Sequence, residues 1–313
     1  MKHYLLLFFK GMAMGAADVV PGVSGGTVAF ITGIYDELLR SLAQLPNAAW
    51  LLLRGRIAEA WQCANATFLL VLVSGILLSV LSLARLITGL LETQPIALWS
   101  FFFGLILVST HIVVREVGRW NLSSVFSALL GGVFAWWITV ASPIHLEGTP
   151  LTLFLAGALA ICAMILPGIS GSFILLLLGL YPVVLGAVKE LDLLVLVIFA
   201  SGCLLGLLSF SKLLNWLLHR WRDITLAFLA GLMLGSLNKV WPWKQTMSWV
   251  TDSHGKLQPL LQDNLWPAQF AQQVGNDPQL LLAISLALAG ALMVLGLEGL
   301  SALLARRAQA KGD

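Results

Sequence analysis

Charged residues are scarce in this sequence. Asp, Glu, Lys and Arg make up only 11% of its 313 residues, against about 25% in a typical soluble domain. Hydrophobic residues account for 59%, and the mean hydropathy is +0.91. Several windows run near or beyond the roughly 18 apolar residues that mark a membrane-spanning helix. This composition excludes a soluble globular domain and indicates a multi-pass protein whose surroundings are the lipid bilayer.

Cysteine is also rare. Cys63, Cys162 and Cys203 are scattered and odd in number, and none belongs to a CxxC pair or a Cys/His cluster. We therefore expect free thiols that pack in the interior, with no disulfide framework, no metal and no cofactor.

Catalytic signatures are missing as well. The sequence contains no P-loop, no HExxH and no nucleophile elbow. Its basic residues lie in short loops rather than in a patch that would suit nucleic acid. These absences predict a protein that is not an enzyme and does not bind nucleic acid.

One motif occurs twice. Residues 21–35 read PGVSGGTVAFITGIY, and residues 167–181 read PGISGSFILLLLGLY. At an offset of 146, the shared positions are Pro21/Pro167, Gly22/Gly168, Ser24/Ser170, Gly25/Gly171, Gly33/Gly179 and Tyr35/Tyr181. An apolar segment broken by Pro and Gly at matching places in two halves is a sequence pointer to a transporter's binding site.

A second block repeats at an offset of 127. It matches Ser74-Gly75 with Ser201-Gly202, Leu81-Ser82 with Leu208-Ser209, Gly104 with Gly231, Ser109 with Ser236 and Arg85 with Lys212. The two halves therefore share a common plan beyond the Pro-Gly motif.

The two motif regions, residues 5–42 and 151–188, are expected to be re-entrant helical hairpins. Each has two apolar arms of roughly 15 residues, which rise about 22 Å, whereas the hydrocarbon core is about 30 Å thick. Proline and glycine would break the chain at mid-membrane, where bare backbone is tolerated only against protein or a wet cavity.

The predicted fold is an all-α polytopic membrane protein built from an inverted-topology repeat. Each half is one hairpin plus three transmembrane helices. The first repeat covers 1–142, with spans at 67–91, 95–114 and 121–142. The second covers 151–304, with spans at 193–218, 223–240 and 279–304. Because three spans are an odd number, the second half must enter the membrane inverted.

The distribution of positive charge predicts the orientation. With cytoplasmic termini, twelve cations face the cytoplasm and four face outward. The cytoplasmic set is Lys2, Lys10, Arg40, Arg54, Arg56, Arg115, Arg119, Arg220, Arg222, Arg306, Arg307 and Lys311. The outer set is Lys189, Lys239, Lys244 and Lys256. Residues 43–65 are expected to form a cytoplasmic surface helix, and the tryptophan-rich segment 241–277 an outer-face loop at the interface.

The hairpin tips suit an anion such as a phosphate or carboxylate. Helix N-termini carry free N–H groups and the positive end of the helix dipole. The predicted binding residues are Ser24, Gly25, Gly26, Thr27, Ser170, Gly171 and Ser172. Packing of small residues between helices is the alternative explanation of the motif.

Four charged residues within apolar segments are further candidates, because such charges are costly. Arg85 and Lys212 could capture an anionic headgroup or could snorkel to the interface. Asp18 and Glu298 could couple transport to a proton or another cation such as sodium. Asp18 could equally cap the broken helix or pair with Lys10.

The stretches GAADVVPGVSGGTVAFITGIYDELL, FFFGLIL and AICAMILPGISGSFILLLLGLY resemble the PopT-type polyprenyl-phosphate transporters, formerly a domain of unknown function. The resemblance covers nearly the whole chain. The family's motif falls on Asp18, Pro21, Gly22, Ser24, Gly25 and Gly26, and on Pro167, Gly168, Ser170, Gly171 and Ser172.

The resemblance implies a flippase of the bacterial plasma (inner) membrane. It would return undecaprenyl phosphate from the outer to the cytoplasmic leaflet for reuse in cell-envelope polysaccharide synthesis. A small-anion carrier or channel stays open as an alternative. An undecaprenyl-diphosphate phosphatase is disfavoured, because Gly25 stands where its motif has Arg and no ExxxE acidic pair lies near the first hairpin. Coupling to a proton or sodium ion and assembly into a homo-oligomer are further expectations.

Overall fold

The structure, a computed structural model, describes residues 2–20, 23–251 and 257–309. Pro21, Gly22, Lys256 and Lys311 lie outside these ranges. Within them the elements are, in chain order, α1 (Lys2–Asp18), α2 (Gly25–Ile31), α3 (Tyr35–Ala43), α4 (Leu45–Leu53), α5 (Ile57–Cys63), α6 (Ala66–Thr93), α7 (Pro95–Glu116), α8 (Leu122–Val140), α9 (Pro150–Ile165), α10 (Gly171–Leu177), α11 (Tyr181–Glu190), α12 (Leu193–Arg220), α13 (Arg222–Ser236), β1 (Lys244–Thr251), β2 (Leu257–Asn264), α14 (Pro267–Gln273) and α15 (Leu280–Gln309).

The all-helical polytopic fold is confirmed. In the described ranges, five helices are long and apolar enough to cross a membrane: Ala66–Leu83 of α6, α7, α8, α12 and Leu280–Gly299 of α15. The sixth predicted span is shorter than expected, because α13 ends at Ser236 and has 15 residues. It rises only about 22 Å and lies in the protein core, with Leu229, Leu232 and Met233 fully buried.

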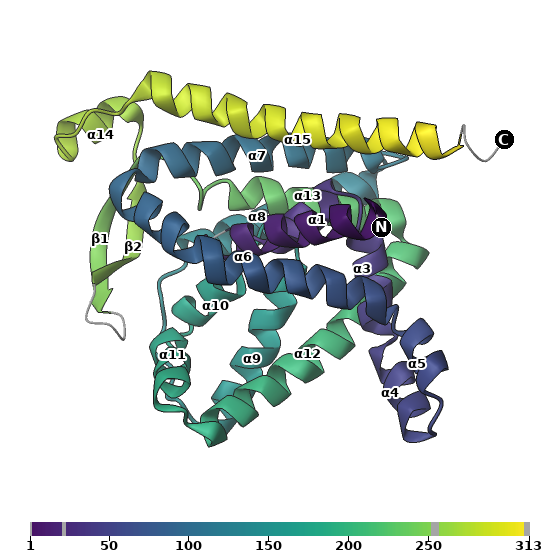
Figure 1. Ribbon diagram of the computed structural model, residues 1–313. Helices are drawn as coiled ribbons and strands as arrows, with labels where there is room; N and C mark the ends of the chain where they lie inside the picture. The colour runs from purple at the N-terminus through teal and green to yellow at the C-terminus, as the bar shows by residue number, and fades with distance from the viewer. Residues whose placement is uncertain (1, 21–22, 252–256, 310–313) are drawn as a thin grey trace.

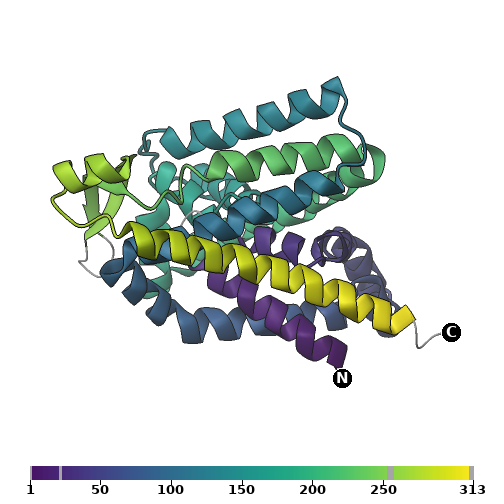
Figure 2. The same cartoon turned by 90° about the horizontal axis from the view of Figure 1, so that it is seen from above.

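The molecule has two distinct ends (Figure 1). The strands β1 and β2 and helix α14 lie at one end, here called the strand end. Helices α4 and α5, the start of α1 and the end of α15 lie at the opposite end, here called the terminal end. The view from above shows the same separation, with α15 running from one end towards the other (Figure 2).

Equivalent glycines make equivalent helix contacts in the two halves. A Cβ on Gly75 of α6 would overlap the carbonyl oxygen of Phe8 in α1, and one on Gly202 of α12 would overlap that of Phe154 in α9. Phe154 is the residue 146 positions after Phe8, so both partners repeat.

The second block of the repeat gives the same result. A Cβ on Gly104 of α7 would overlap the carbonyl oxygen of Ala287 in α15, and one on Gly231 of α13 would overlap that of Ala128 in α8. Accordingly α1 packs on α6 as α9 does on α12, and α7 on α15 as α13 does on α8. These contacts support the internal repeat, whereas its inverted orientation across a bilayer stays a prediction.

The hairpin regions have one more break than expected. The arm after each Pro-Gly motif was expected to be one helix, but it divides into α2 and α3 in the first region and into α10 and α11 in the second. Gly33 and Gly179 at these breaks have φ angles of 70° and 71°, a left-handed conformation that glycine adopts without steric cost. The axes of α10 and α11 differ by 110°.

Two surface segments also differ from prediction. Residues 43–65 form the two short helices α4 and α5 rather than one, because the chain turns at Gly55 with φ 74°. The segment 241–277 contains an antiparallel β-hairpin, with Lys244 opposite Asn264, in addition to α14. Trp249 and Trp266 are exposed, whereas Trp243 is buried, and its indole N–H donates to the Pro278 carbonyl at 2.8 Å. The interfacial position of the segment stays a prediction.

Close contact between α7 and α15 gives a first prediction. Gly104→Ala places a methyl group against the α15 backbone, which cannot yield as a side chain would. We expect a loss of about 1–3 kcal/mol of stability, as for overpacked cores, measured as a lower melting temperature of the detergent-purified protein. The matched control is Gly296→Ala in α15, where nothing lies within 4 Å. Equal melting temperatures for the two variants would contradict the contact.

Candidate functional site

The first hairpin tip is closed by its own side chains. Ser24 is fully buried, and its hydroxyl oxygen accepts from the Gly26 N–H at 3.1 Å. One carboxylate oxygen of Asp18 accepts from the Gly25 N–H at 2.7 Å. Since the first N–H groups of a helix lack partners within the helix, these two contacts occupy the positions where an external anion would bind. Of the roles predicted for Asp18, the structure shows that of a cap at the start of α2.

Lys10 does not pair with Asp18. Its ammonium donates instead to the Thr32 carbonyl at 2.6 Å, just before the Gly33 break. A coupling role for Asp18 stays a prediction.

The two hairpins are joined where proline breaks the second one. Proline has no N–H, so the last carbonyls of α9 need partners from elsewhere. The Ser24 hydroxyl lies 3.2 Å from the Met164 carbonyl oxygen and 3.1 Å from that of Leu166. The Tyr35 hydroxyl donates to the Ile165 carbonyl at 3.0 Å.

One further hydrogen bond crosses this junction, with its donor in the second hairpin and its acceptor in the first. The Gly168 N–H donates to the Thr27 hydroxyl at 3.0 Å, and Thr27 is fully buried. We call these contacts of Ser24, Thr27 and Tyr35 the hairpin latch. Two predicted binding residues, Ser24 and Thr27, thus hold the hairpins together in this conformation.

The second hairpin tip is built differently. Ser170 does not cap α10 with its side chain, and its hydroxyl lies 2.9 Å from that of Ser172. Gly168 has φ 89° and packs against Ser236 and Met233 of the α13 segment so closely that a Cβ would not fit. The tip borders a small pocket, here called the tip pocket, lined by Ala135, Ile138, Thr139, Gly168, Ile169, Ser170, Phe173, Ser236 and Lys239.

Lys239 supplies a positive charge to this pocket. Its ammonium lies 4.3 Å from the centre of the Phe173 ring, and in the described part of the chain no carboxylate forms an ion pair with it. Its side chain is only partly exposed. A cation that is largely removed from water without an acidic partner favours the arrival of an anion.

Lys244 lies next to Lys239 in a buried position. Its ammonium donates to the Lys239 carbonyl at 2.5 Å and lies 3.8 Å from the centre of the Trp99 ring. Burial, and secondarily the charge of Lys239, lower the pKa of Lys244 well below its ordinary value. Lys239 is therefore the lysine that lines the tip pocket, and the buried Lys244 is shifted towards its neutral form.

The repeat explains why the tips differ. At the offset of 146, Asp18 corresponds to Met164, so the second tip lacks the capping carboxylate. At the offset of 127, Lys239 corresponds to Ile112, which is buried. The first tip thus contains an acid and no cation, and the second contains a cation and no acid. The distribution of charge predicts Lys239 only as an outer-face cation, although at the second offset Lys239 is a position where the repeat is broken.

The other predicted cations are exposed. Arg85 and Lys212 lie on the outer surfaces of α6 and α12, and their role at the headgroup stays a prediction. Glu298 lies 3.9 Å from Arg115 at the terminal end. Within the described residues, no group of three or more His, Cys, Asp or Glu side chains could hold a metal.

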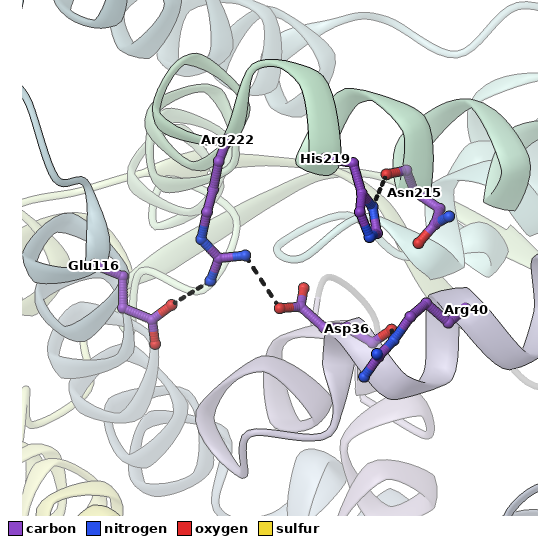
Figure 3. Close-up of polar contacts among 6 residues, drawn as sticks. All are labelled: Asp36, Arg40, Glu116, Asn215, His219 and Arg222. Carbon is purple, nitrogen blue, oxygen red and sulfur yellow. Dashed lines mark hydrogen bonds and ion pairs between the residues drawn. The ribbon is translucent and has the colours of Figure 1, made fainter.

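An ionic cluster joins the helices at the terminal end (Figure 3). Arg222, at the start of α13, contacts Asp36 of α3 at 3.2 Å and Glu116 of α7 at 3.5 Å. The neighbouring Asp223 accepts from the N–H groups of Gly118 and Arg119 at 2.9 and 3.1 Å. We call Arg222, Asp36 and Glu116 the terminal-end cluster.

Comparison with known proteins identifies the family. Residues 14–258 match the family model described as VCA0040-like, undecaprenyl phosphate translocase-like. The chain belongs to this undecaprenyl phosphate translocase-like family. No solved structure matches it.

Two relatives of this translocase-like chain are named polyprenyl-phosphate transporter. The protein from Vibrio cholerae serotype O1 is 54% identical over 297 residues, which cover 95% of this chain and 96% of the relative. The protein from Staphylococcus aureus is 32% identical over 253 residues, which cover 74% and 84%. The family and both relatives are named as transporters and not as enzymes.

The two tips give a second prediction, on paired serines. Ser24→Ala removes the donor to two carbonyls and the acceptor for Gly26, and an unsatisfied buried polar group costs about 1–3 kcal/mol. Ser170→Ala removes only a contact with Ser172. We expect Ser24→Ala to lower the melting temperature of the purified translocase-like protein clearly and Ser170→Ala to lower it little. The reverse order would contradict the closed first tip and the open second one.

Proposed function

We propose that this protein is a flippase for undecaprenyl phosphate. It moves the lipid from the outer to the cytoplasmic leaflet of the bacterial plasma membrane, where the carrier re-enters envelope polysaccharide synthesis. The observation that carries the proposal is the uncapped second tip beside Lys239, an arrangement that attracts a phosphate. The family match and the names of the two relatives support the same substrate.

The proposed orientation places the strand end outside. The positive-inside rule favours a cytoplasmic position for the terminal end. This end contains α4, α5, the start of α1 and the end of α15 (Figure 1). The tip pocket is lined by Thr139 near the end of α8 and by Lys239 after α13, both towards the strand end. A headgroup in the outer leaflet would then meet Lys239 first.

In the proposed mechanism the phosphate binds between Lys239 and the second tip. The Ser170 and Ser172 hydroxyls and the Gly171 N–H donate to its oxygens, and Lys239 provides a charge-assisted bond. The isoprenoid tail stays in the bilayer.

Rocking of one repeat against the other then opens the terminal end. Separation of the hairpins frees the Ser24 and Thr27 hydroxyls from the hairpin latch, so that they can donate to the phosphate on its way inward, while Gly25 and Gly26 stay capped by Asp18 and Ser24. The terminal-end cluster has to separate in the same step. Its side chains are about half exposed, and exposed ion pairs contribute only about 0–1 kcal/mol each, so this end opens at low cost.

A small-anion carrier is the second candidate, because the same lysine and serines would bind inorganic phosphate. The names of the relatives favour the lipid. Asp18 and Glu298 remain proposed coupling sites for a proton or sodium ion.

A third prediction tests the lysine. Lys239→Gln should weaken binding of undecaprenyl phosphate to the purified protein roughly tenfold to a hundredfold, because hydrogen bonds to charged groups contribute about 1.5–3 kcal/mol. Cells that depend on the variant should accumulate the lipid on their outer surface, detected with a probe for the lipid phosphate. Inorganic phosphate as competitor separates the two candidates: wild-type protein that binds it as tightly as the lipid would favour the small-anion carrier.

Arg85→Gln and Lys212→Gln test the separate proposal that these two exposed cations capture the headgroup. Loss of transport in these variants would support their proposed capture of the headgroup on either side of the membrane. Unchanged transport in both would contradict that capture. Unchanged binding and transport in Lys239→Gln would contradict the tip pocket as the phosphate site.

A further inference from the structure

The turn after α13 is held by the first residue pair of the β-hairpin. Lys244 of β1 lies opposite Asn264 of β2. The Asn264 side-chain amide donates to the Asn238 carbonyl at 2.7 Å, and the Lys244 amino group donates to the Lys239 carbonyl at 2.5 Å. Carbonyl groups at the end of a helix lack partners within the helix, so the β-hairpin supplies partners for these two. The strand end therefore fixes the backbone that carries Lys239.

A chain of hydrogen bonds leads from this turn to another residue that lines the tip pocket, Thr139 of α8. The Asn264 amide nitrogen lies 2.8 Å from the side-chain oxygen of Asn238. The Asn238 amide nitrogen lies 2.8 Å from the Thr139 hydroxyl oxygen. Because Asn264 also donates to a backbone carbonyl, its role as donor is fixed. The Asn238 side chain must then accept with its oxygen and donate to Thr139 with its nitrogen.

This chain determines what the Thr139 hydroxyl can do. Its oxygen accepts from Asn238, so its proton is left to donate. In this structure it donates to the Trp136 carbonyl, three residues earlier in α8, at 2.7 Å. A hydroxyl proton rotates to suit its acceptor, so a phosphate oxygen in the tip pocket can replace that carbonyl. The bond received from Asn238 strengthens the bond that the hydroxyl donates.

The internal repeat shows which residue of the first half corresponds to Thr139. Helices α8 and α15 make equivalent contacts at an offset of 159. A Cβ on Gly131 of α8 would overlap the Phe228 carbonyl oxygen in α13. A Cβ on Gly290 of α15 would overlap the Phe101 carbonyl oxygen in α7. Phe228 lies 127 positions after Phe101, so both sides of this contact repeat.

The two halves differ at the positions of the lysine and the threonine. At the offset of 159, Thr139 corresponds to Glu298, and at the offset of 127, Lys239 corresponds to Ile112. The second half thus has a cation and a hydroxyl where the first half has an apolar residue and an acid. A carboxylate repels a phosphate, whereas a hydroxyl donates to it. Both differences therefore make the tip pocket more suitable for an anion.

We propose that Thr139 is a phosphate-binding residue of the tip pocket, and that Asn238, held by Asn264, is the positioning residue that orients its hydroxyl. This inference rests on the proposed function. It adds a third hydroxyl to those of Ser170 and Ser172, and this one comes from a different helix. The β-hairpin then fixes both the lysine and the threonine of the phosphate site.

Thr139→Val and Thr139→Ser test the hydroxyl. Valine keeps the branched shape of threonine, so we expect the affinity of the purified protein for undecaprenyl phosphate to fall roughly tenfold, as for a lost hydrogen bond to a charged group. The affinity for inorganic phosphate should fall by the same factor, because the hydroxyl contacts the phosphate. Serine restores the hydroxyl and should restore the wild-type affinities. Thr93→Val is the matched control, since it removes a hydroxyl that donates to the Gly89 carbonyl in α6, outside the tip pocket.

A double-mutant cycle tests Asn238. Asn238→Ala keeps the backbone carbonyl that accepts from Asn264 and removes the side-chain link to Thr139. It should weaken lipid binding in the wild-type background and cause no further loss in Thr139→Val, because the two substitutions remove the same interaction. A loss of equal size in both backgrounds would show that Asn238 only stabilises the turn, and would overturn its positioning role.

The outcomes separate this inference from the function on which it rests. If wild-type protein binds undecaprenyl phosphate and Thr139→Val binds it equally well, the inference is wrong and the proposed function stands. If Thr139→Ser binds as weakly as Thr139→Val, the residue acts through its packing, and the inference is also wrong. A loss with the lipid but not with inorganic phosphate would overturn it too, since the hydroxyl would then not contact the phosphate. If wild-type protein binds inorganic phosphate but not the lipid, the proposed flippase fails, and Thr139→Val still tests the hydroxyl with inorganic phosphate. If it binds neither, both are wrong.

Discussion

The broken helix at Pro167 sets the constraint on which this structure depends. Inside a bilayer no water is present to satisfy free backbone groups, so a break is tolerated only where protein supplies the missing partners. The first hairpin supplies them through Ser24, Tyr35 and Thr27. The first tip also has free backbone N–H groups that need partners. Asp18 satisfies one of them by accepting a hydrogen bond from the Gly25 N–H.

The asymmetry of the two tips follows from this constraint. A repeat with two identical tips would either leave both open, with two sets of unsatisfied N–H groups, or close both, with no place for a ligand. In this chain one tip is closed by Asp18 and stabilises the break of the other. The second tip has Met164 in place of the acid and Lys239 in place of Ile112. Its helix α10 has no side-chain cap, and among the described residues Lys239 has no acidic partner. In the proposed mechanism, the paired motif thus divides structure and binding between its copies.

The sequence predicted the parts of this arrangement that repeat. Gly75 and Gly202, or Gly104 and Gly231, are recognisable because a close helix contact tolerates no side chain, and the contact recurs in both halves. The two tips were found for the same reason. Deviations from the repeat are harder to interpret. The sequence shows that Lys239 departs from the repeat, but only the fold shows that Lys239, in the segment after α13, lies beside the second tip.

Other features had no signal of that kind. The β-hairpin at Lys244–Thr251 and Leu257–Asn264 is a local structure in a polar, tryptophan-rich segment whose pattern predicts only a loop. The second break in each hairpin had a signal, the repeated Gly33 and Gly179, but a glycine in an apolar helix is common in membranes. Only the positive φ angles identify them as breaks.

The energies of the closing contacts are in the range that transport requires. The hairpin latch has three donors, from Ser24, Tyr35 and Gly168, each worth about 0.5–1.5 kcal/mol net. The two ion pairs of Arg222 add about 0–1 kcal/mol each. Together these contacts stabilise the closed conformation by about 1.5–6.5 kcal/mol. An energy difference of a few kcal/mol, which lies within this range, leaves a second conformation populated at about 0.1–10%. A phosphate that forms its best contacts only after the hairpins separate can shift such an equilibrium by its differential affinity alone. The same contacts therefore satisfy the broken backbone and are weak enough to allow the proposed rocking of the repeats.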